Sequence, residues 1–232
     1  MYDYEYTPKR FNILPPVCKN LLIINVLMWL LSFVLERRGI HLENLLGLHF
    51  IFASDFRFWQ LITYSFLHAN FNHLFFNMFA IWMFGYTLEN IWGTKKFITY
   101  CLVACLGAAI MQEITYYFMY SDLLTNKYAD VNLDGVILSK STFLNHLNTI
   151  GASGICFGLL AAFGLMFPNT YVYFYFLVPI KTKWFVIGYI VIELFSGIIG
   201  TSDGIAHFAH LGGALFGLIL VLLWKKKNSN RY

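Results

Sequence analysis

The chain has 232 residues, a mass of 26.9 kDa and a net charge of +4, and its composition limits its fold more than its length does. Hydrophobic residues make up 59% of the sequence and charged residues 12%, about half of the ~25% that is usual in soluble proteins. So few charged groups could not cover the surface of a water-soluble globule. A soluble enzyme, a nucleic-acid-binding protein and a disordered chain are therefore excluded. The mean hydropathy of +0.62 indicates that most of the chain is dissolved in lipid.

Six apolar runs of membrane-crossing length follow one another along the chain. We expect them at about residues 18–35, 71–88, 97–119, 150–167, 184–200 and 205–224. Because an open sheet leaves backbone groups unpaired in hydrocarbon, each run is predicted to be a helix. The predicted fold class is all-α, a polytopic membrane protein with six spans. A short N-terminal tail (1–17), one membrane domain (18–224) and a basic C-terminal tail (225–232) complete the expected organisation.

The lysines and arginines predict how the chain is oriented. No cleavable signal peptide is visible in the first fifteen residues, so the first span is expected to remain, and six spans place both ends on one side. Eleven basic residues fall on that side: Lys9, Arg10, Lys19, Lys95, Lys96, Lys181, Lys183, Lys225, Lys226, Lys227 and Arg231. Five fall opposite: Arg37, Arg38, Arg57, Lys127 and Lys140. The positive-inside rule therefore predicts cytoplasmic termini. The expected location is the plasma (bacterial inner) membrane.

Two outer segments are not expected to cross the membrane. Residues 36–70 carry amphipathic stretches that are too polar to span, so they should lie in the interface or fold back into it. Residues 120–149 are predicted to form a long polar connection. This connection contains part of a calcium-loop pattern, formed by Asp130, Asn132, Asp134 and Gly135. Position twelve of such a loop should be a glutamate that binds calcium, but it is Ser141 here, so we interpret the pattern as a solvated turn.

Polar residues gather near the outer ends of the second, fourth and sixth spans, which all run in the same direction. The second span opens with His73 and Asn77, the fourth with Ser153, and the sixth with His207 and His210. Polar side chains are costly in a bilayer and normally face the interior of a bundle or a wet cavity. Their common depth predicts one water-accessible pocket. A hydroxyl and an imidazole on separate helices are the minimum for nucleophilic catalysis.

The residues around Ser153 and His210 fit such chemistry. Gly151 and Gly154 flank Ser153 at the start of its helix, where unpaired amides could stabilise an oxyanion. His73 and Asn77 are four residues apart and share one helix face. Small residues at helical spacing let backbones approach closely, and Phe157 could offer a flat surface to the His210 ring. The small residues on the two facing helices are Gly154 and Gly158, and Gly213 and Gly217.

Each of these features has a structural explanation when taken alone. Glycine and serine are common at contacts between membrane helices, a lone histidine is usually a satisfied polar group, and Asn77 could bond one helix to another. The convergence of three helices at one depth favours catalysis.

Together these residues resemble the rhomboid family of intramembrane serine proteases. The matching elements are His73-Leu74-Phe75-Phe76-Asn77, Gly151-Ala152-Ser153-Gly154, and Ala209-His210-Leu211-Gly212-Gly213 followed by Gly217. The order, spacing and placement of these elements agree with the family, and the resemblance covers residues 18–224. It implies the basic six-span rhomboid form, whose partners are transmembrane protein substrates and the lipid bilayer.

The resemblance also implies roles for individual residues. Ser153 would be the nucleophile and His210 the general base of a catalytic dyad that cuts transmembrane segments near the outer face. The Ser153 amide, His73 and Asn77 would form the oxyanion hole. Substrates would enter between the second and fifth spans, past the aromatic residues Phe79, Trp82, Trp184 and Phe195.

The chain departs from the family pattern at two positions outside the dyad. Gln60 follows Trp59 where a Trp-Arg pair is common, which leaves open how the outer loop is held. Phe157 replaces a tyrosine, so the ring is kept and its hydroxyl is lost.

The sequence is also compatible with other catalytic residues and with other functions. His207 is the residue most easily confused with the base, and Asp203 is a candidate third member of a triad, whereas Glu113 and Glu193 are interpreted as bundle-facing or helix-end groups. His207 and His210 could hold a metal, but no carboxylate or thiol partner is evident nearby, so no metal site or cofactor is expected. A small transporter or channel is the alternative function, with a path formed by His73, Asn77, His207, Glu113 and Glu193. A catalytically inactive, substrate-binding relative is a third possibility.

Overall fold

Among the described residues, six helices of 14 residues or more form the fold, and they correspond to the six apolar runs of the sequence. The computed structural model describes residues 11–126, 130–133, 135–174, 177–200 and 205–229. The helices are α1 (Pro16–Glu36), α4 (Phe71–Trp92), α5 (Thr94–Met119), α8 (Ser153–Met166), α9 (Thr182–Ile199) and α10 (His207–Ser229). Helices α1, α5, α9 and α10 are long and apolar enough to cross a membrane. The predicted polytopic all-α fold is confirmed, and the boundaries differ by only a few residues.

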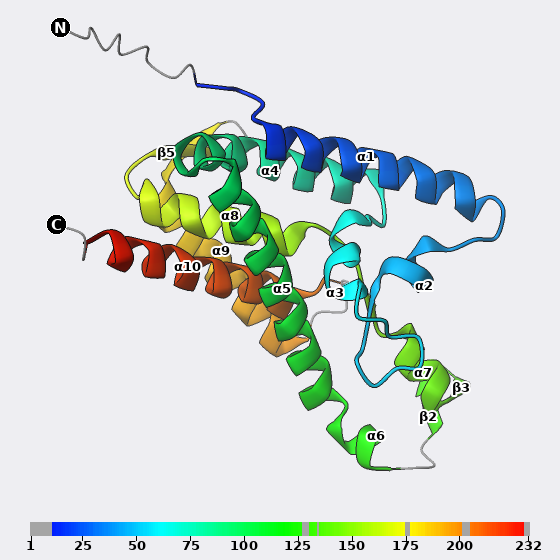
Figure 1. The fold of residues 1–232 in the computed structure, drawn as a ribbon. Coiled ribbons are helices and arrows are strands. Elements are labelled where there is room, and N and C mark those ends of the chain that lie inside the picture. The colour runs from blue at the N-terminus through cyan, green and yellow to red at the C-terminus, as the bar shows by residue number, and fades with distance from the viewer. Residues whose placement is uncertain (1–10, 127–129, 134, 175–176, 201–204, 230–232) are drawn as a thin grey trace, which may run out of the picture.

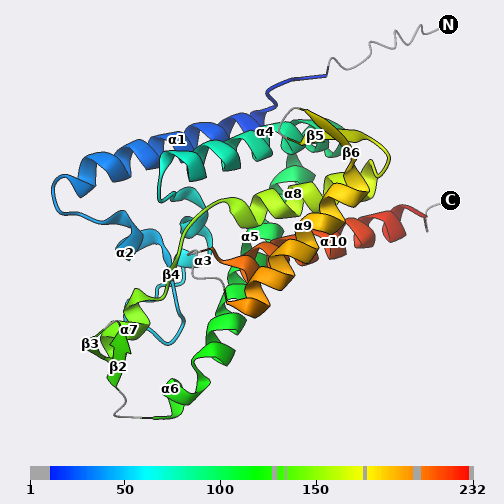
Figure 2. The same cartoon turned by 180° about the vertical axis from the view of Figure 1, so that it is seen from behind.

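Helix α8 lies in the middle of the bundle. It has only 14 residues, a length of about 21 Å at 1.5 Å per residue, and nine of them are buried. It contacts α4, α5, α9 and α10. Helix α5 crosses one face of α8 and α10 in Figure 1, and α9 lies on the opposite face, toward the viewer in Figure 2. The residues of α8 are therefore shielded from lipid by the other helices.

Glycines allow α8, α10 and α5 to approach at the level of their backbones. A Cβ atom at Gly213 of α10 would collide with the backbone of Gly154 in α8. A Cβ atom at Gly158 would lie 2.8 Å from the Ala104 Cβ of α5, and one at Gly217 would collide with the Tyr100 hydroxyl. The close helix approach expected from the spacing of these glycines is present.

Helix α1 is attached to α4 through a buried carboxylate. The amides of Val17 and Cys18 donate to the two carboxylate oxygens of Glu89, each at 2.9 Å. Glu89 is only 2% exposed. A carboxylate at a helix N-terminus pairs amides that have no partner inside the helix and complements the helix dipole. Glu89 therefore fixes the start of α1, a role that the sequence analysis did not assign.

The segment between α1 and α4 contains only short elements, none of which is long enough to cross a membrane. It contains α2 (Leu42–Leu46), β1 (Leu48–His49), α3 (Gln60–Thr63) and the 3-10 helix η1 (Tyr64–Phe66). Strand β1 pairs with β4 (Asn148–Thr149), which lies just before α8. The pairing ties this segment to the chain that leads into α8.

Gln60 holds this segment together from within. Its side chain is fully buried. The amide oxygen accepts from the backbone N–H groups of Arg57 and His49, at 3.0 and 3.4 Å. The amide nitrogen donates to the carbonyls of Asp55 and Leu45, at 3.0 and 3.4 Å. The neutral amide of Gln60 thus stabilises the loop through hydrogen bonds to its backbone. An arginine is common at this position in the family that the chain resembles.

The described part of the connection at residues 120–149 has more secondary structure than the sequence predicts. It contains α6 (Ser121–Thr125), the antiparallel strands β2 (Asp130–Leu133) and β3 (Val136–Ser139), and α7 (Lys140–His146). Asn132 Oδ1 accepts from the Gly135 amide at 2.8 Å. The partial calcium pattern thus belongs to a β-hairpin, and Asp134 lies outside the described residues. The Asp-Gly pair is typical of hairpin turns, so the two strands could have been predicted.

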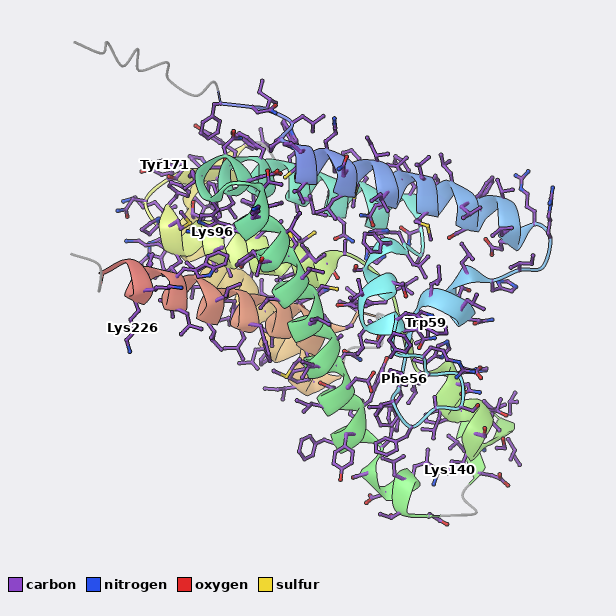
Figure 3. All side chains as sticks on the ribbon, viewed as in Figure 1. Phe56, Trp59, Lys96, Lys140, Tyr171 and Lys226 are labelled. Atoms are coloured by element: carbon purple, nitrogen blue, oxygen red, sulfur yellow. The ribbon has the colours of Figure 1, made fainter. Side chains whose placement is uncertain are left out.

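Basic residues gather at the end of the bundle where α1 begins and α10 ends. Strands β5 (Tyr171–Phe174) and β6 (Val178–Lys181) form a hairpin at this end, between α8 and α9. Figure 3 shows Lys96, Tyr171 and Lys226 at this end, and Phe56, Trp59 and Lys140 toward the other. Lys96 and Lys226 thus lie at the end that the sequence predicts to be cytoplasmic, and Lys140 lies toward the opposite end.

We predict that Gly213→Leu destabilises the bundle, because the new side chain must push α10 away from the backbone of α8. Overpacking of this kind costs about 1–3 kcal/mol. The measurement is the thermal unfolding midpoint in detergent. Gly188→Ala on α9 is the matched control, since nothing lies within 4 Å of a Cβ atom there. Equal losses of stability in both variants would contradict the packing argument.

Candidate active site

Ser153 and His210 meet at the contact between α8 and α10. The Ser153 Oγ lies 2.7 Å from His210 Nε2, although the two residues are 57 positions apart in the chain. This distance suits transfer of the hydroxyl proton to the imidazole. Gly154 follows Ser153, and Gly213 lies one helical turn after His210, so the glycine contact between the helices is adjacent to the pair.

The turn before Ser153 gives the serine its position at the start of α8. Gly151 has φ +127°, a conformation that side chains other than glycine rarely adopt. Its amide donates to the Tyr64 carbonyl at 2.9 Å. Ser153 is the first residue of the helix, and the Cys156 amide bonds to Ala152 O at 3.1 Å. The amides before Cys156 have no acceptor within the helix, as at any helix N-terminus.

His73 lies beside this turn. A Cβ atom added to Gly151 would lie 2.7 Å from His73 Nε2 and 3.7 Å from Ser153 Oγ. The His73 ring therefore occupies the space that the missing side chain leaves. The Asn70 side chain caps α4 by accepting from the His73 amide at 2.9 Å. The cap places His73 in the first turn of α4.

Asn77 is buried on the same face of α4. The Cys156 thiol lies 3.5 Å from Asn77 Oδ1 and 3.4 Å from the Asn77 carbonyl. Asn77 Nδ2 is buried and has no hydrogen-bond partner among the described residues. An unpaired buried donor is unusual, because most such groups in proteins are satisfied. This N–H group is therefore available to a ligand oxygen.

The His210 ring is held by two further side chains. Phe157, one turn after Ser153 on α8, stacks on it with a centroid distance of 4.3 Å and an interplanar angle of 8°. Glu193 Oε2 on α9 lies 2.9 Å from His210 Nδ1. The stacking and the hydrogen bond fix the plane of the imidazole, so its Nε2 atom faces the serine.

Glu193 also contacts His207. Its Oε2 atom lies 2.8 Å from His207 Nδ1, and all three side chains are buried. Of the two histidines, His210 is the one that bonds to the Ser153 hydroxyl. Glu193 faces the bundle as expected, but its contact with the histidines was not predicted. The available indication was an ionisable residue within an apolar span, which is by default a candidate functional group.

Glu113 has a different partner. Glu113 Oε2 accepts from the Ile51 amide at 2.7 Å, so it links α5 to the outer segment. Asp203 lies outside the described residues.

From the sequence we expect no carboxylate near His207 and His210, and this expectation was wrong. A carboxylate does lie beside the two histidines, and Glu193, His207 and His210 offer ligand atoms within 4.8 Å of one another. Two imidazoles and one carboxylate are a ligand set that zinc uses. The spacings of 2.8 and 2.9 Å are those of two N–H groups donating to one oxygen.

Comparison with known proteins identifies the family. The model of the Rhomboid domain matches residues 55–227, which contain α4, α5, α8, α9, all but the last two residues of α10, and all the residues of the site. The chain belongs to the rhomboid family. The resemblance found in the sequence motifs is confirmed.

Three relatives illustrate how far the similarity extends. The "Putative rhomboid protease YdcA" of Bacillus subtilis (strain 168) is 27% identical over 228 residues, which cover 97% of this chain and 96% of the relative. Rhomboid protease AarA of Providencia stuartii is 23% identical over 72% of this chain and 56% of its own length. RHOMBOID-like protein 6, mitochondrial, of Arabidopsis thaliana is 28% identical over 75% of this chain. The chain spans about half, 49%, of that plant rhomboid.

A second histidine lies beside His73 in this rhomboid. His68 precedes α4, is 5% exposed, and has no hydrogen-bond partner for either ring nitrogen among the described residues. Its ring lies 4.9 Å from the His73 ring. Burial, together with the nearby His73, lowers the pKa of His68 from 6.5 to about 3. His68 is therefore a neutral neighbour of His73, and the sequence analysis did not single it out.

We predict that His68 makes the stability of the rhomboid depend on pH. In the unfolded chain this histidine takes up a proton near pH 6.5, whereas in the folded protein it stays neutral down to about pH 3. The unfolded state therefore gains protons first, and stability should fall as the pH drops from 7 to 4.5. His68→Phe should reduce that fall in the thermal midpoint. The exposed His41→Gln is the control, and an unchanged pH dependence in His68→Phe would refute the argument.

Proposed function

We propose that this rhomboid is an intramembrane serine endopeptidase with Ser153 as nucleophile and His210 as general base. The observation that carries the proposal is the 2.7 Å contact between Ser153 Oγ and His210 Nε2 within a helical membrane bundle. A serine hydroxyl is a poor nucleophile until a base removes its proton. The relatives that are named as rhomboid proteases support the same reaction class.

The reaction follows from the positions of these groups. Ser153 Oγ attacks the scissile carbonyl carbon, and its proton moves to His210 Nε2. The carbonyl oxygen becomes an oxyanion, which the Ser153 amide, the His73 ring and Asn77 Nδ2 stabilise. His210 then protonates the leaving amine, and an acyl-enzyme remains. Water, activated by the same imidazole, releases the second product.

The membrane determines which substrates can react. The amides of a transmembrane helix are bonded to its own carbonyls, so a segment must unwind before a carbonyl can reach Ser153. Transmembrane proteins with glycine or other helix-weakening residues near the outer face should therefore be cut preferentially. With both termini in the cytoplasm, the site lies toward the outer side of the plasma membrane.

Lateral entry between α4 and α9 suits the exposed aromatic residues of these two helices. Helix α9 packs mainly against α8 and α10, and only three of its residues are buried. Trp184 and Phe195 of α9 are 60% and 65% exposed, and Trp82 of α4 is 37% exposed. These side chains, with Phe79, would contact an incoming substrate helix.

Ser153→Ala should abolish cleavage of a transmembrane substrate in reconstituted vesicles, with a rate loss of at least about a thousandfold. The variant should also lose labelling by a fluorophosphonate, which reacts with activated serines. Ser32→Ala on α1, whose hydroxyl bonds to the Met28 carbonyl, is the matched control and should remain active. Undiminished cleavage by Ser153→Ala would disprove the proposal, and ion or proton flux that survives this substitution would favour a transporter.

Asn77→Leu should lower kcat about 10²–10³-fold and leave KM nearly unchanged, because the lost donor acts on the oxyanion rather than on the bound substrate. The measurement is steady-state cleavage of the same substrate. Asn25→Leu is the control, since Asn25 is also buried in a span but its Nδ2 bonds to Leu21 O on α1. A change confined to KM would show that Asn77 does not stabilise the oxyanion.

A further inference from the structure

We propose that Glu193 is a positioning residue for His210, so that this protein works with a Ser153–His210–Glu193 triad instead of the dyad that its family resemblance implies. The inference rests on the proposed function. It concerns the group that orients the base, and it assigns a role to a side chain that the dyad does not use.

The three side chains form a continuous chain of hydrogen bonds from three helices. Ser153 Oγ of α8 lies 2.7 Å from His210 Nε2 of α10. On the other side of the same ring, Nδ1 lies 2.9 Å from Glu193 Oε2 of α9. Each ring nitrogen of His210 thus has one partner, and the imidazole lies between the nucleophile and the carboxylate. This is the order of groups that a catalytic triad requires.

The carboxylate determines which ring nitrogen carries the proton. An ionised carboxylate can only accept hydrogen bonds, so His210 must donate through Nδ1–H. The Nε2 atom is then left with a lone pair that faces the Ser153 hydroxyl. Without an acceptor at Nδ1, the ring is free to adopt the other tautomer, in which Nε2 carries hydrogen and cannot act as a base.

Glu193 also stabilises the positive charge that develops on His210. During attack, the proton passes from Ser153 Oγ to His210 Nε2, and the imidazole becomes positively charged while Glu193 keeps its negative charge. The charges then lie 2.9 Å apart in a buried site, where their attraction is stronger than in water. The step therefore creates an ion pair instead of an isolated buried cation.

His207 explains how a carboxylate can be kept at this position within the bundle. Its Nδ1 atom lies 2.8 Å from the same Oε2 atom, so the oxygen accepts two N–H groups. Among the described residues, the ion-pair contacts of Glu193 are those with His207 and His210. A buried charge is costly unless hydrogen bonds compensate it. His207 thus holds the carboxylate, and the carboxylate holds the base.

The location of Glu193 on α9 argues against an accidental contact. Only Thr182, Val186 and Glu193 are buried on this helix, and its other large side chains are mostly exposed and apolar. A carboxylate placed at random on such a helix would face lipid, at a high cost. Instead, it occupies the face that meets the catalytic residues.

The test uses Glu193→Gln, which removes the charge, and Glu193→Leu, which also removes the acceptor. We expect kcat to fall at least tenfold in the first and about a hundredfold or more in the second, with KM within about threefold of wild type. The second-order rate of fluorophosphonate labelling at Ser153 should fall in parallel, because labelling needs the activated serine but no substrate entry. Glu193→Asp keeps the carboxylate and should retain more activity than Glu193→Gln.

Two variants serve as controls. Glu113→Gln on α5 alters another glutamate of the bundle, one that bonds to the Ile51 amide, and should leave kcat within about threefold of wild type. His207→Gln keeps a donor for Glu193 and should lose less than tenfold. Thermal midpoints of all variants separate loss of folding from loss of chemistry.

The outcomes separate this inference from the proposed function. Wild-type protein that neither cleaves nor labels would overturn the function itself. Active wild type with unchanged kcat and labelling in Glu193→Leu would overturn the triad and leave the dyad in place. Loss of wild-type activity in EDTA, restored by added Zn²⁺, would also overturn the triad, because Glu193 would then be a metal ligand.

Discussion

The backbone contact between α8 and α10 is the constraint on which the site depends. Gly154 and Gly213 leave no side chain between these helices, and the serine and histidine next to them are brought to 2.7 Å. Hydrophobic attraction cannot draw helices together in lipid, which is itself apolar, so close packing of small residues must do so. A longer separation would break the hydrogen bond between Ser153 and His210 inside the bundle. The same glycines therefore serve the stability of the fold and the proposed chemistry.

The remaining parts of the site are held by segments that do not cross the membrane. Strand β1 pairs with β4 just before the turn at Gly151, and η1 supplies the Tyr64 carbonyl that accepts from the Gly151 amide. Gln60 ties the same outer segment together by bonding only to backbone groups. These contacts fix the start of α8, so the position of Ser153 depends on an outer segment as well as on the bundle.

The sequence alone predicts the helices and the main polar residues well, because both leave patterns that are local. Apolar runs mark the spans, and His73, Asn77, Ser153 and His210 stand out against them. The roles of Glu89, Glu193 and His68 could not be predicted, because each depends on a partner from a distant segment. Glu89 caps α1 from α4, and Glu193 reaches α10 from α9. A single carboxylate in an apolar run indicates that some partner exists, but spacing does not identify it.

Helix α9 combines two roles that the proposed mechanism assigns to different steps. Its exposed aromatic side chains lie on the proposed route of entry, and its buried Glu193 orients the base. The helix is attached to the bundle by few buried side chains, of which Glu193 is one. A movement of α9 away from the bundle would therefore also strain the bonds of Glu193 to His207 and His210. On the proposed route of entry, the position of α9 would therefore affect the base as well as the passage of the substrate.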